Sequence, residues 1–537
     1  MIIPKSIART AAISRFALPL LLLLCFVRYL PSLFSNAIGL YHDDGIYLLT
    51  GRALAEGQGY RLISIPGALL QTKYPILYPA LLALLWHLDP TYPDNTVVFR
   101  AVNLVLWLGT MALTYRLLVR FRYTTPLVAL FIIAWLGLSD RAGRFTGMVL
   151  TECLGTFLLT ASLWFCETAL EAAPNRRAVL PALACGLTLG LAFLTRTSFL
   201  FVWIALAWSL LRRTRRGFAA MTLAALPAYA GWALWTRRIP RLPGWDPRSY
   251  YVDYLGWILH QYALTPLPLI FAANLLTLVI FALPNHVLPF LTHDLVVTIL
   301  PPSLAWLVAI LGLATTGLIV WGGVLLWRED RPLFPLFVLT AALPVCAMPS
   351  GIDRYMFPLG APCLVLAVRG WQDLYARLGR RAIALSALTG LLLLCGAWSD
   401  IASAAAPYLT PPWQPDPWTA TTSWVRDNVP TGEGVCAEID PVIFLATGHP
   451  AISDRCWISL HREGLVVNWL GRPGYCPNPQ AQRELFRQMN IRWFVTTGLL
   501  GTNREFGAPN LVVARPQWFD LAYSAGGPYG LHIYHLR

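Results

Sequence analysis

Three acidic residues lie in short segments between apolar runs, where a carboxylate can face a substrate. Asp43 and Asp44 occur in the segment His42-Asp43-Asp44-Gly45-Ile46-Tyr47, and Glu152 stands at the end of the second such segment. A carboxylate within hydrogen-bond reach of a hydroxyl can accept its proton and so act as a general base. The alternatives are a solvated loop start for the two aspartates and an N-terminal helix cap for Glu152.

Cations lie in neighbouring segments of the same kind. Lys73 stands in Gln71-Thr72-Lys73-Tyr74-Pro75, Arg196 in a corner between two apolar runs, and Arg354 before Tyr355, while Arg141 and Arg144 precede Glu152. Guanidinium and ammonium groups bind phosphate strongly. The gathering of these cations therefore predicts a site that holds an anionic substrate. Lys73 and Arg196 could instead extend along lipid to reach the membrane interface.

The composition determines which elements position these residues. The chain has 537 residues, of which 56% are hydrophobic and 13% charged, and its mean hydropathy is +0.55. Apolar runs of about 17–25 residues recur along its first three quarters, and each is long enough to span hydrocarbon as a helix. The sequence predicts an all-α polytopic membrane protein. The net charge of +14 does not indicate nucleic-acid binding, because the basic residues form short clusters between apolar runs.

These clusters also predict the topology, since Lys and Arg mark cytoplasmic loops. Threading the runs gives about 13 crossings, with the N-terminus inside and the C-terminus outside. The run near Phe16 to Phe34 is expected to be a retained first helix, and two crossings are expected between Pro266 and Leu300. Pro75 to Leu88 is too short to span comfortably and is expected at the outer interface. All the acids and cations named above then lie on the outer side.

The chain divides into predicted domains by composition. Residues 1–405 are the transmembrane domain, within which residues 36–96 are the first outer loop, with the acidic motif and an interfacial helix. A proline-rich linker precedes an extracytoplasmic α/β domain, residues 406–537. In it we expect helices over Thr422–Asn428 and Gln480–Met489, and strands over Gly434–Glu438 and Arg492–Thr496. Its cysteines are Cys436, Cys456 and Cys476. Two of them could form a disulfide, or all three could be free thiols.

The first outer loop resembles a known family. His42–Tyr47, followed by Gly51-Arg52-Ala53-Leu54-Ala55-Glu56-Gly57-Gln58-Gly59-Tyr60-Arg61, is similar to the first outer loop of the C-superfamily transferases that use lipid-phosphate sugars. That superfamily includes the protein O-mannosyltransferases (glycosyltransferase family 39) and the lipid A aminoarabinose transferases. Thr72–Pro79, Leu191–Arg196 and Arg354–Pro358 resemble further segments of the family. The likeness covers most of the membrane part and is weaker after Glu152.

The resemblance implies roles for the matching residues. Asp43 would be the general base, Asp44 would orient it or the acceptor, and Glu152 would be the acid of the second loop. Lys73, Arg196 and Arg354 would bind the donor phosphate and neutralise the charge that grows on it. The remaining substrate contacts are expected from Tyr47, Arg61, Tyr74 and Tyr355. The family's usual outcome is inversion by direct attack.

The expected function is transfer of a sugar from a polyprenyl-phosphate donor to a hydroxyl of a lipid, glycan or protein acceptor, in a bacterial inner membrane. No metal or other cofactor is expected to be essential, because Thr72 stands where the aminoarabinose transferases have an acid linked to metal. His42 could ligate a cation, but a lone histidine is expected to be a surface residue.

A transporter or flippase of a lipid-linked sugar and a catalytically silent membrane scaffold are the alternatives. The transporter is disfavoured because the acids lie in loops and no inverted repeat is recognisable. A scaffold would tolerate the loss of Asp43, whereas an enzyme would not. The sugar, the acceptor and the oligomeric state stay open.

Overall fold

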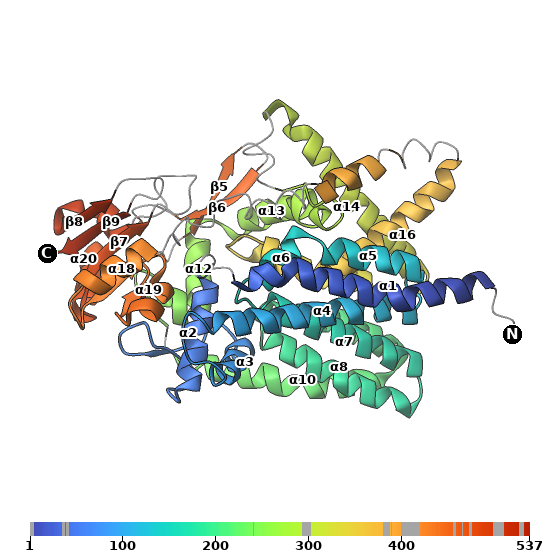
Figure 1. Ribbon diagram of the computed structural model, residues 1–537, viewed down its shortest axis with the longest axis horizontal. Helices are drawn as coiled ribbons and strands as arrows, with labels where there is room; N and C mark the ends of the chain where they lie inside the picture. Colours follow the sequence, from blue (N-terminus) through green and yellow to red (C-terminus); the bar gives the residue numbers. More distant parts are fainter. Residues whose placement is uncertain are drawn as a thin grey trace.

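The computed structural model describes residues 5–34, 38, 42–239, 241–292, 302–379, 387, 389–398, 419–454, 458–463, 466–471, 475–497, 510–525 and 531–537. Long helices make up most of the chain before Thr419, and the larger sheet follows it (Figure 1). The C-terminal sheet lies at one end of an elongated helical bundle, and the N-terminus lies at the other. The predicted class, a helical membrane protein with a small C-terminal α/β region, is confirmed.

Seven helical segments within the described ranges are long and apolar enough to cross a membrane, or eight if a pair bent by 59° counts as one span. This makes the chain an integral membrane protein. The bent pair consists of α5 (Pro126–Gly137) and α6 (Asp140–Thr146). The other spans are Phe16–Phe34 at the end of α1 (Lys5–Tyr29), α4 (Thr96–Arg120), α7 (Glu152–Ala172), Arg176–Phe193 with α8 (Val179–Phe193), α10 (Arg215–Thr236), Leu267–His286 from α13 (Leu267–Thr277), and α14 (Ala305–Arg328).

The expected count of about 13 crossings is not confirmed. Several predicted spans are instead shorter pieces: 3-10 turns precede both α9 (Val202–Arg213) and α16 (Gly360–Leu378), and α15 (Leu333–Ala342) has ten residues. Prolines coincide with such breaks, as Pro344 follows α15 and Pro358 precedes α16, because proline lacks the donor that continues a helix. Most of the second crossing expected before Leu300 lies outside the described residues.

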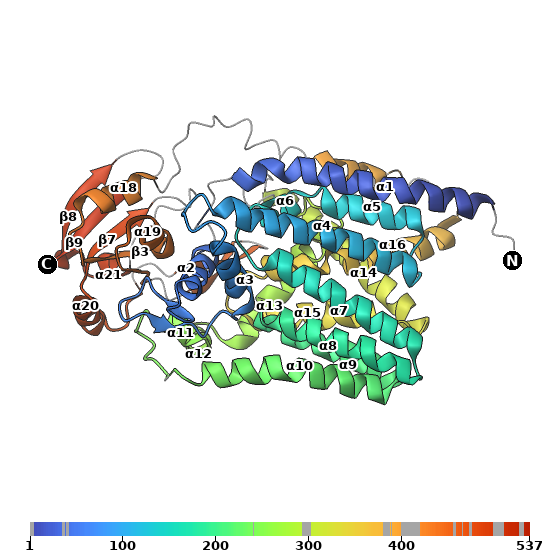
Figure 2. The same ribbon diagram turned by 60° about the horizontal axis from the view of Figure 1, so that its bottom comes forward.

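Helices α4, α7, α8 and α10 run side by side along the long axis (Figures 1 and 2). Helices α14 and α16 cross closely: a methyl group at Gly322 would overlap the carbonyl oxygen of Leu366, and one at Gly370 would overlap that of Leu318. Glycine at both positions lets the two backbones touch, which is how small residues bring membrane helices together.

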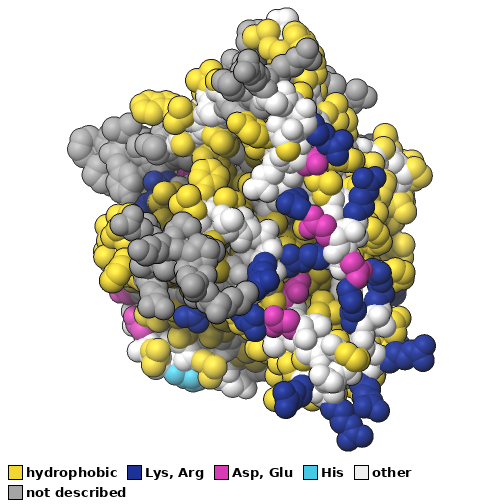
Figure 3. Space-filling model, turned by 90° about the vertical axis from the view of Figure 1, so that its right-hand side faces the viewer, with side chains coloured by type: hydrophobic (Ala, Val, Ile, Leu, Met, Phe, Trp, Pro, Cys, Tyr) yellow, Lys and Arg dark blue, Asp and Glu magenta, His cyan; other side chains and the backbone are white. Residues whose placement is uncertain are grey.

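The end of the bundle farthest from the C-terminal sheet is rich in basic side chains (Figure 3). Three helices end on an arginine, namely Arg120 of α4, Arg213 of α9 and Arg328 of α14, and Arg377 is the next-to-last residue of α16. Some of these arginines pair with nearby acids, as Arg120 does with Glu171 in the last turn of α7 at 2.9 Å.

The C-terminal region is built on a five-stranded sheet in the order β4-β3-β7-β9-β8. Strands β4 (Ala451–Ile452), β3 (Gly434–Ala437) and β7 (Ile491–Thr497) are parallel, while β9 (Leu531–Leu536) and β8 (Phe519–Ala525) add antiparallel pairs. The helices are α18 (Thr419–Asn428), α19 (Asp440–Thr447), α20 (Pro479–Gln488) and α21 (Asn510–Ala514), and β5 (Ile458–Glu463) with β6 (Val466–Gly471) forms a separate hairpin. All four predicted elements are present, within three residues of the expected bounds.

A disulfide among the three cysteines of this region stays a prediction. Cys436 is buried in β3, and the Cys476 sulfur lies 2.6 Å from Oε1 of Gln482. Cys456 lies outside the described residues.

The segment that the sequence predicts to be the first outer loop lies between the bundle and the sheet. It contains α2 (Asp43–Ala55), the short strands β1 (Arg61–Leu62) and β2 (Leu69–Leu70), and α3 (Leu77–Trp86). Its contact with the C-terminal region includes a backbone hydrogen bond of 2.8 Å from Ala451 N to the carbonyl of Ser64. Helix α19 lies beside α2 in both ribbon views.

Candidate active site

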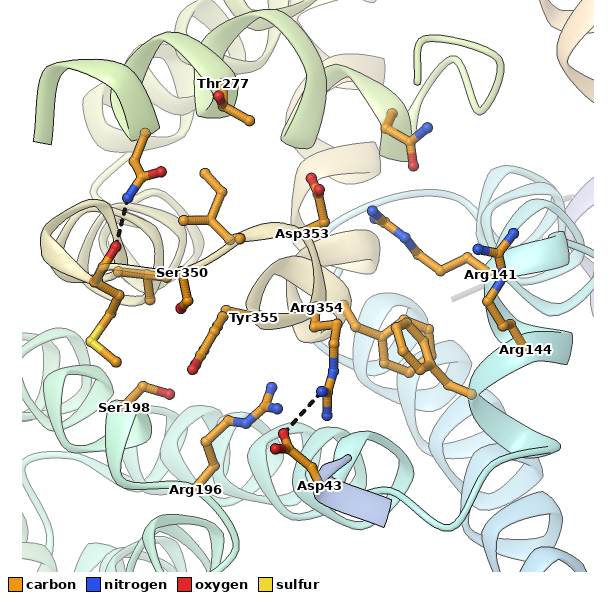
Figure 4. Close-up of a pocket in the computed structure, with 18 of the residues that line it drawn as sticks. Asp43, Arg141, Arg144, Arg196, Ser198, Thr277, Ser350, Asp353, Arg354 and Tyr355 are labelled. Atoms are coloured by element: carbon orange, nitrogen blue, oxygen red, sulfur yellow. Dashed lines mark hydrogen bonds and ion pairs between the residues drawn. The ribbon is translucent and has the colours of Figure 1, made fainter. Parts of the chain in front are cut away.

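A cavity of about 1230 Å³ opens among the first outer loop, α6, the turn after α8, and the segment before α16. Figure 4 shows Asp43 and Arg196 facing it from two separate segments, and the neighbours Arg354 and Tyr355 facing it from a third. Its Lys, Arg and Asp lining comprises five cations and three acids, namely Lys73, Arg141, Arg144, Arg196, Arg354, Asp43, Asp140 and Asp353. Most of the residues predicted from the sequence are therefore brought together in one place.

Asp43 is the first residue of α2, where its carboxylate also benefits from the exposed N–H groups of the helix terminus. Its Oδ1 accepts a hydrogen bond of 2.5 Å from the Tyr74 hydroxyl, and its Oδ2 accepts one of 3.0 Å from Nη1 of Arg354. Burial by itself would raise the pKa of Asp43. The charges of Arg354 and Lys73 outweigh burial and hold this pKa below its ordinary value, so the group is a carboxylate at neutral pH.

Glu152 is the first residue of α7 and is buried. Its Oε1 accepts hydrogen bonds from Nε of Arg354 at 2.8 Å and from Nη2 of Arg196 at 3.1 Å. Arg354, in the 3-10 segment Asp353–Leu359, thus joins the acids of the first and second outer loops. The second oxygen of Glu152, Oε2, has no hydrogen-bond partner among the described residues.

Arg196 lies in the turn that follows α8, as the sequence predicted. Its guanidinium is 4.5 Å from the centre of the Tyr355 ring, which is a stacking distance for a cation on an aromatic face. Tyr355 therefore orients a predicted phosphate-binding side chain from the segment that also carries Arg354.

Lys73 lies in an aromatic cage. Its ammonium nitrogen is 3.2 Å from the ring centre of Tyr250, 4.9 Å from that of Tyr74, 5.2 Å from that of Tyr254 and 5.7 Å from that of Trp257. Tyr250 belongs to α11 (Ser249–Val252), and Tyr254 and Trp257 to α12 (Tyr254–Leu264). Cation–π contacts of this kind are stronger when the cation is shielded from water, and Lys73 is 9% exposed.

These three rings on α11 and α12 were not predicted from the sequence as site residues. The signal was the aromatic spacing Tyr250, Tyr254 and Trp257, which places the rings near one face of a helical segment. Such spacing is equally typical of a helix packed against a core, so it does not identify a site by itself.

Three other predicted residues are placed as follows. Tyr47 lines the cavity, with its ring packed edge-on against those of Tyr74 and Tyr78. Asp44 is fully buried and interacts electrostatically with Arg100 of α4, and it does not line the cavity. Arg61 also lies away from the cavity, in β1, where its Nη1 donates to the carbonyl of Ala68 at 3.0 Å.

Two arginines of the second outer loop extend the cationic surface of the cavity. Arg141 and Arg144 project from α6 across the cavity from Ser198 (Figure 4). Arg144 pairs with Asp140 at 2.7 Å and remains half exposed. The next residue, Phe145, packs against Phe357 and helps to fix α6 beside the segment that carries Arg354.

Three side chains at this site that could bind a metal ion are instead bonded to a guanidinium group or to the main chain. Asp43 and Glu152, the two acids that the sequence predicted and that Arg354 connects, are both bonded to it. Thr72 directs its hydroxyl to the carbonyl of Val252. The described residues contain no group of three or more His, Cys, Asp or Glu side chains that could hold a metal.

Comparison with known proteins gives the fold. No protein-family model and no curated protein matches the sequence. Among solved structures, the apo oligosaccharyltransferase of Archaeoglobus fulgidus is similar with a TM-score of 0.55 and 11% identity, covering 96% of this chain and 74% of that one. ArnT from Cupriavidus metallidurans, solved with undecaprenyl phosphate bound, is similar with a TM-score of 0.50 and 13% identity, covering 96% and 97%. The chain therefore has the same fold as these two membrane proteins, which agrees with the resemblance of the segment around Asp43 to the C-superfamily transferases.

Proposed function

We propose that this protein is an inverting glycosyltransferase that moves a sugar from a polyprenyl-phosphate donor to a hydroxyl acceptor at the outer face of a bacterial inner membrane. The observation that carries the proposal is the ionised carboxylate of Asp43, which faces a cavity where cations outnumber acids. The fold supports it, because the similar proteins include one solved with undecaprenyl phosphate and one solved with a dolichol-phosphate.

In the proposed reaction the acceptor oxygen attacks the anomeric carbon of the sugar while the bond from that carbon to the phosphate oxygen breaks. Asp43 accepts the proton of the acceptor hydroxyl, and the electron pair of the broken bond remains on the phosphate. Lys73, Arg196 and Arg354 are proposed to neutralise that charge, which is greatest after the bond has broken. Attack opposite the leaving phosphate inverts the anomeric centre.

Glu152 has a supporting role in this proposal. By accepting hydrogen bonds from both Arg354 and Arg196, it holds the two guanidinium groups at fixed positions beside the base. Tyr47, Tyr74 and Tyr355 are proposed to contact the donor or acceptor from the cavity wall. Asp44 is proposed to fix the start of α2 through its buried position near Arg100.

The proposed orientation places the arginine-rich helix ends in the cytoplasm and the cavity outside, as the positive-inside rule requires. Residues 406–537 then form an extracytoplasmic domain and residues 36–96 an outer loop. A cysteine introduced at Asp94 should react with an impermeant reagent added from outside. Labelling only from the cytoplasmic side would overturn this orientation.

The test of the function compares Asp43→Asn with Asp353→Asn in membranes supplied with a panel of radiolabelled polyprenyl-phosphate sugars. Asp353 is the matched control, since it is an exposed acid that lines the same cavity. General bases contribute about 10²–10⁴-fold to rate, so Asp43→Asn should lose at least 100-fold in kcat while Asp353→Asn stays close to the parent.

Each other outcome has a definite meaning. Equal activity in Asp43→Asn and the parent would move the base to another residue. If the parent transfers sugar from no donor, the transferase proposal fails. A vesicle assay for movement of the labelled lipid across the bilayer would then separate a transporter from a silent scaffold.

A further inference from the structure

An ion pair joins the C-terminal region to the residue that precedes the proposed base. Nε2 of His42 lies 2.8 Å from Oδ1 of Asp440, 398 positions later in the sequence. The Asp440 side chain is fully buried, and that of His42 is 17% exposed. The sequence-based expectation that His42 is a surface residue is therefore wrong. A buried carboxylate needs such a partner, because an isolated buried charge is strongly unfavourable.

The backbone at His42 adopts a conformation that this contact helps to maintain. His42 has φ of 60° and ψ of −44°, in the left-handed half of the Ramachandran plot that residues other than glycine seldom occupy. Its carbonyl accepts the hydrogen bond from Ile46 N, at 3.2 Å, that begins α2. Such conformations persist where the surroundings enforce them. The imidazole held by Asp440 is one such constraint, directly before Asp43.

A second contact brings the start of α19 against the start of α2. A methyl group at Gly45 would lie 2.5 Å from Cβ of Pro441, so the two helix starts approach more closely than any side chain at position 45 would permit. Asp440 and Pro441 thus contact both sides of Asp43 in the sequence, at His42 and at Gly45.

The same pair connects to the aromatic cage of Lys73. The His42 ring lies 5.7 Å from the rings of both Tyr250 and Tyr251. Tyr251 is hydrogen-bonded to Asp440 and accepts a hydrogen bond from Ser453 N at 2.9 Å. Tyr250 is the ring nearest the ammonium group of Lys73. Residues of the C-terminal region therefore support both the proposed base and a proposed phosphate-binding residue.

We propose that Asp440 is a positioning residue for sugar transfer, acting through His42 to hold the turn that presents Asp43 to the acceptor. This inference rests on the proposed function, and it makes the C-terminal region part of the catalytic centre rather than a separate module. A buried ion pair gives little net stability by itself. The pair instead fixes one arrangement of the start of α2 relative to the start of α19.

The pair also has an electrostatic consequence. The ionisable groups that face His42 are Asp440 of α19, Asp43 of α2, Lys73 of the first loop, and Tyr250 and Tyr251 of α11. Burial lowers the pKa of His42, but Asp440 and Asp43 outweigh it and raise this pKa above the ordinary value. Cationic His42 in turn contributes to the low pKa of Asp43. Removing the charge of Asp440 should therefore raise the pKa of Asp43.

The experiment measures transfer against pH with the full chain in lipid nanodiscs. The variants are Asp440→Asn, His42→Gln and both together. The control is Asp454→Asn, which alters a buried acid of the same region whose Oδ2 accepts from Leu511 N at 3.0 Å. We expect Asp440→Asn to lower kcat at least tenfold and to move the acidic limb of the pH profile to higher pH. The double variant should be no worse than the more impaired single variant, because the two residues act as a unit.

Hydrogen exchange of residues 42–50 gives a second readout that does not depend on turnover, and Asp440→Asn should exchange faster there than Asp454→Asn does. A kcat and pH profile equal to those of the parent would overturn the positioning role. The positioning role would also be overturned if Asp440→Asn lost only as much activity as Asp454→Asn and its pH profile did not shift. A parent that transfers no sugar would overturn the proposed function instead, and the exchange result would still show whether Asp440 holds the turn.

Discussion

The guanidinium of Arg354 donates a hydrogen bond of 3.0 Å to Oδ2 of Asp43, although 311 positions separate the two residues in the sequence. Through its Nε the same group also bonds Glu152, at 2.8 Å. A guanidinium presents its donors in a rigid plane, whereas an ammonium is a single point of charge. Arg354 therefore sets the spacing between the two carboxylates as well as compensating their charge.

Replacing Arg354 should impair both activity and stability. Arg354→Gln leaves Asp43 and the buried Glu152 without their shared partner, and breaking a buried ion pair costs about 3–5 kcal/mol. We expect the melting temperature to fall and kcat to drop at least 100-fold, with Arg354→Lys in between because it keeps the charge and loses the planar fork.

The control for Arg354 is Arg377→Gln, which removes an exposed arginine paired with Asp373 at 2.7 Å. Exposed pairs contribute about 0–1 kcal/mol, so this variant should behave like the parent. Parental kcat in Arg354→Gln would contradict the bridging role.

Tyr74→Phe tests the ionisation of Asp43. The Tyr74 hydroxyl donates to Oδ1 at 2.5 Å and is one of the groups that keep the pKa of Asp43 low. Because this pKa is below its ordinary value in the folded protein, the charged base is retained until the pH falls through the lowered pKa. Losing the hydroxyl raises that pKa, so the acidic limb of kcat/KM should move to higher pH.

Tyr78→Phe is the matched substitution for this measurement. The Tyr78 hydroxyl is also buried, but its partner is Asn103. Its pH profile should coincide with that of the parent. Identical profiles for Tyr74→Phe and Tyr78→Phe would argue against Asp43 as the titrating base.

Lys73 should be sensitive even to the conservative change to arginine. Lys5 and Lys73 are the two lysines of the sequence, whose other cationic side chains apart from histidine are arginines. Four rings within 3.2 to 5.7 Å enclose the ammonium group, and a guanidinium is larger and flat.

For Lys73→Met we expect the KM for the donor to rise by roughly 10- to 100-fold, since a hydrogen bond to a charged group contributes about 1.5–3 kcal/mol. Lys73→Arg should recover less than half of that loss on a logarithmic scale. Donor titration by steady-state kinetics measures both. An unchanged KM in Lys73→Met would remove Lys73 from the phosphate-binding set.

The sequence predicted the local parts of this structure well. Apolar run length identified the membrane helices, and the motif around Asp43 indicated the fold. Pairs such as Arg354 with Asp43 and His42 with Asp440 were not predictable in the same way, because hydrophobic periodicity describes single segments and does not say which loops meet. The number of membrane crossings could not be predicted either, because Pro344 and Pro358 interrupt helices within runs that are continuously apolar by hydropathy.

A pair of glycines in α14 offers a test of helix packing. A methyl group at Gly317 would have no atom within 4 Å, whereas one at Gly322 would overlap the backbone of α16. Alanine is favoured over glycine within helices by about 1 kcal/mol. Gly317→Ala should therefore match or exceed the parent in thermal stability, and Gly322→Ala should melt at a clearly lower temperature. Equal melting temperatures would mean that the two helices separate more easily than their contact implies.

The crossing of α14 with α16 bears on how the site responds to its substrate. With glycine backbones in contact at Gly322 and Gly370, neither helix can slide along the other without an overlap. Arg354 lies in the segment that leads directly into α16, so its main chain is carried by this rigid pair. If the proposed reaction is right, we therefore expect a lipid-linked sugar to be accommodated by rotation of side chains and not by movement of α14 against α16. Sugar preference would then change by substitution of cavity residues while these two helices stay in place.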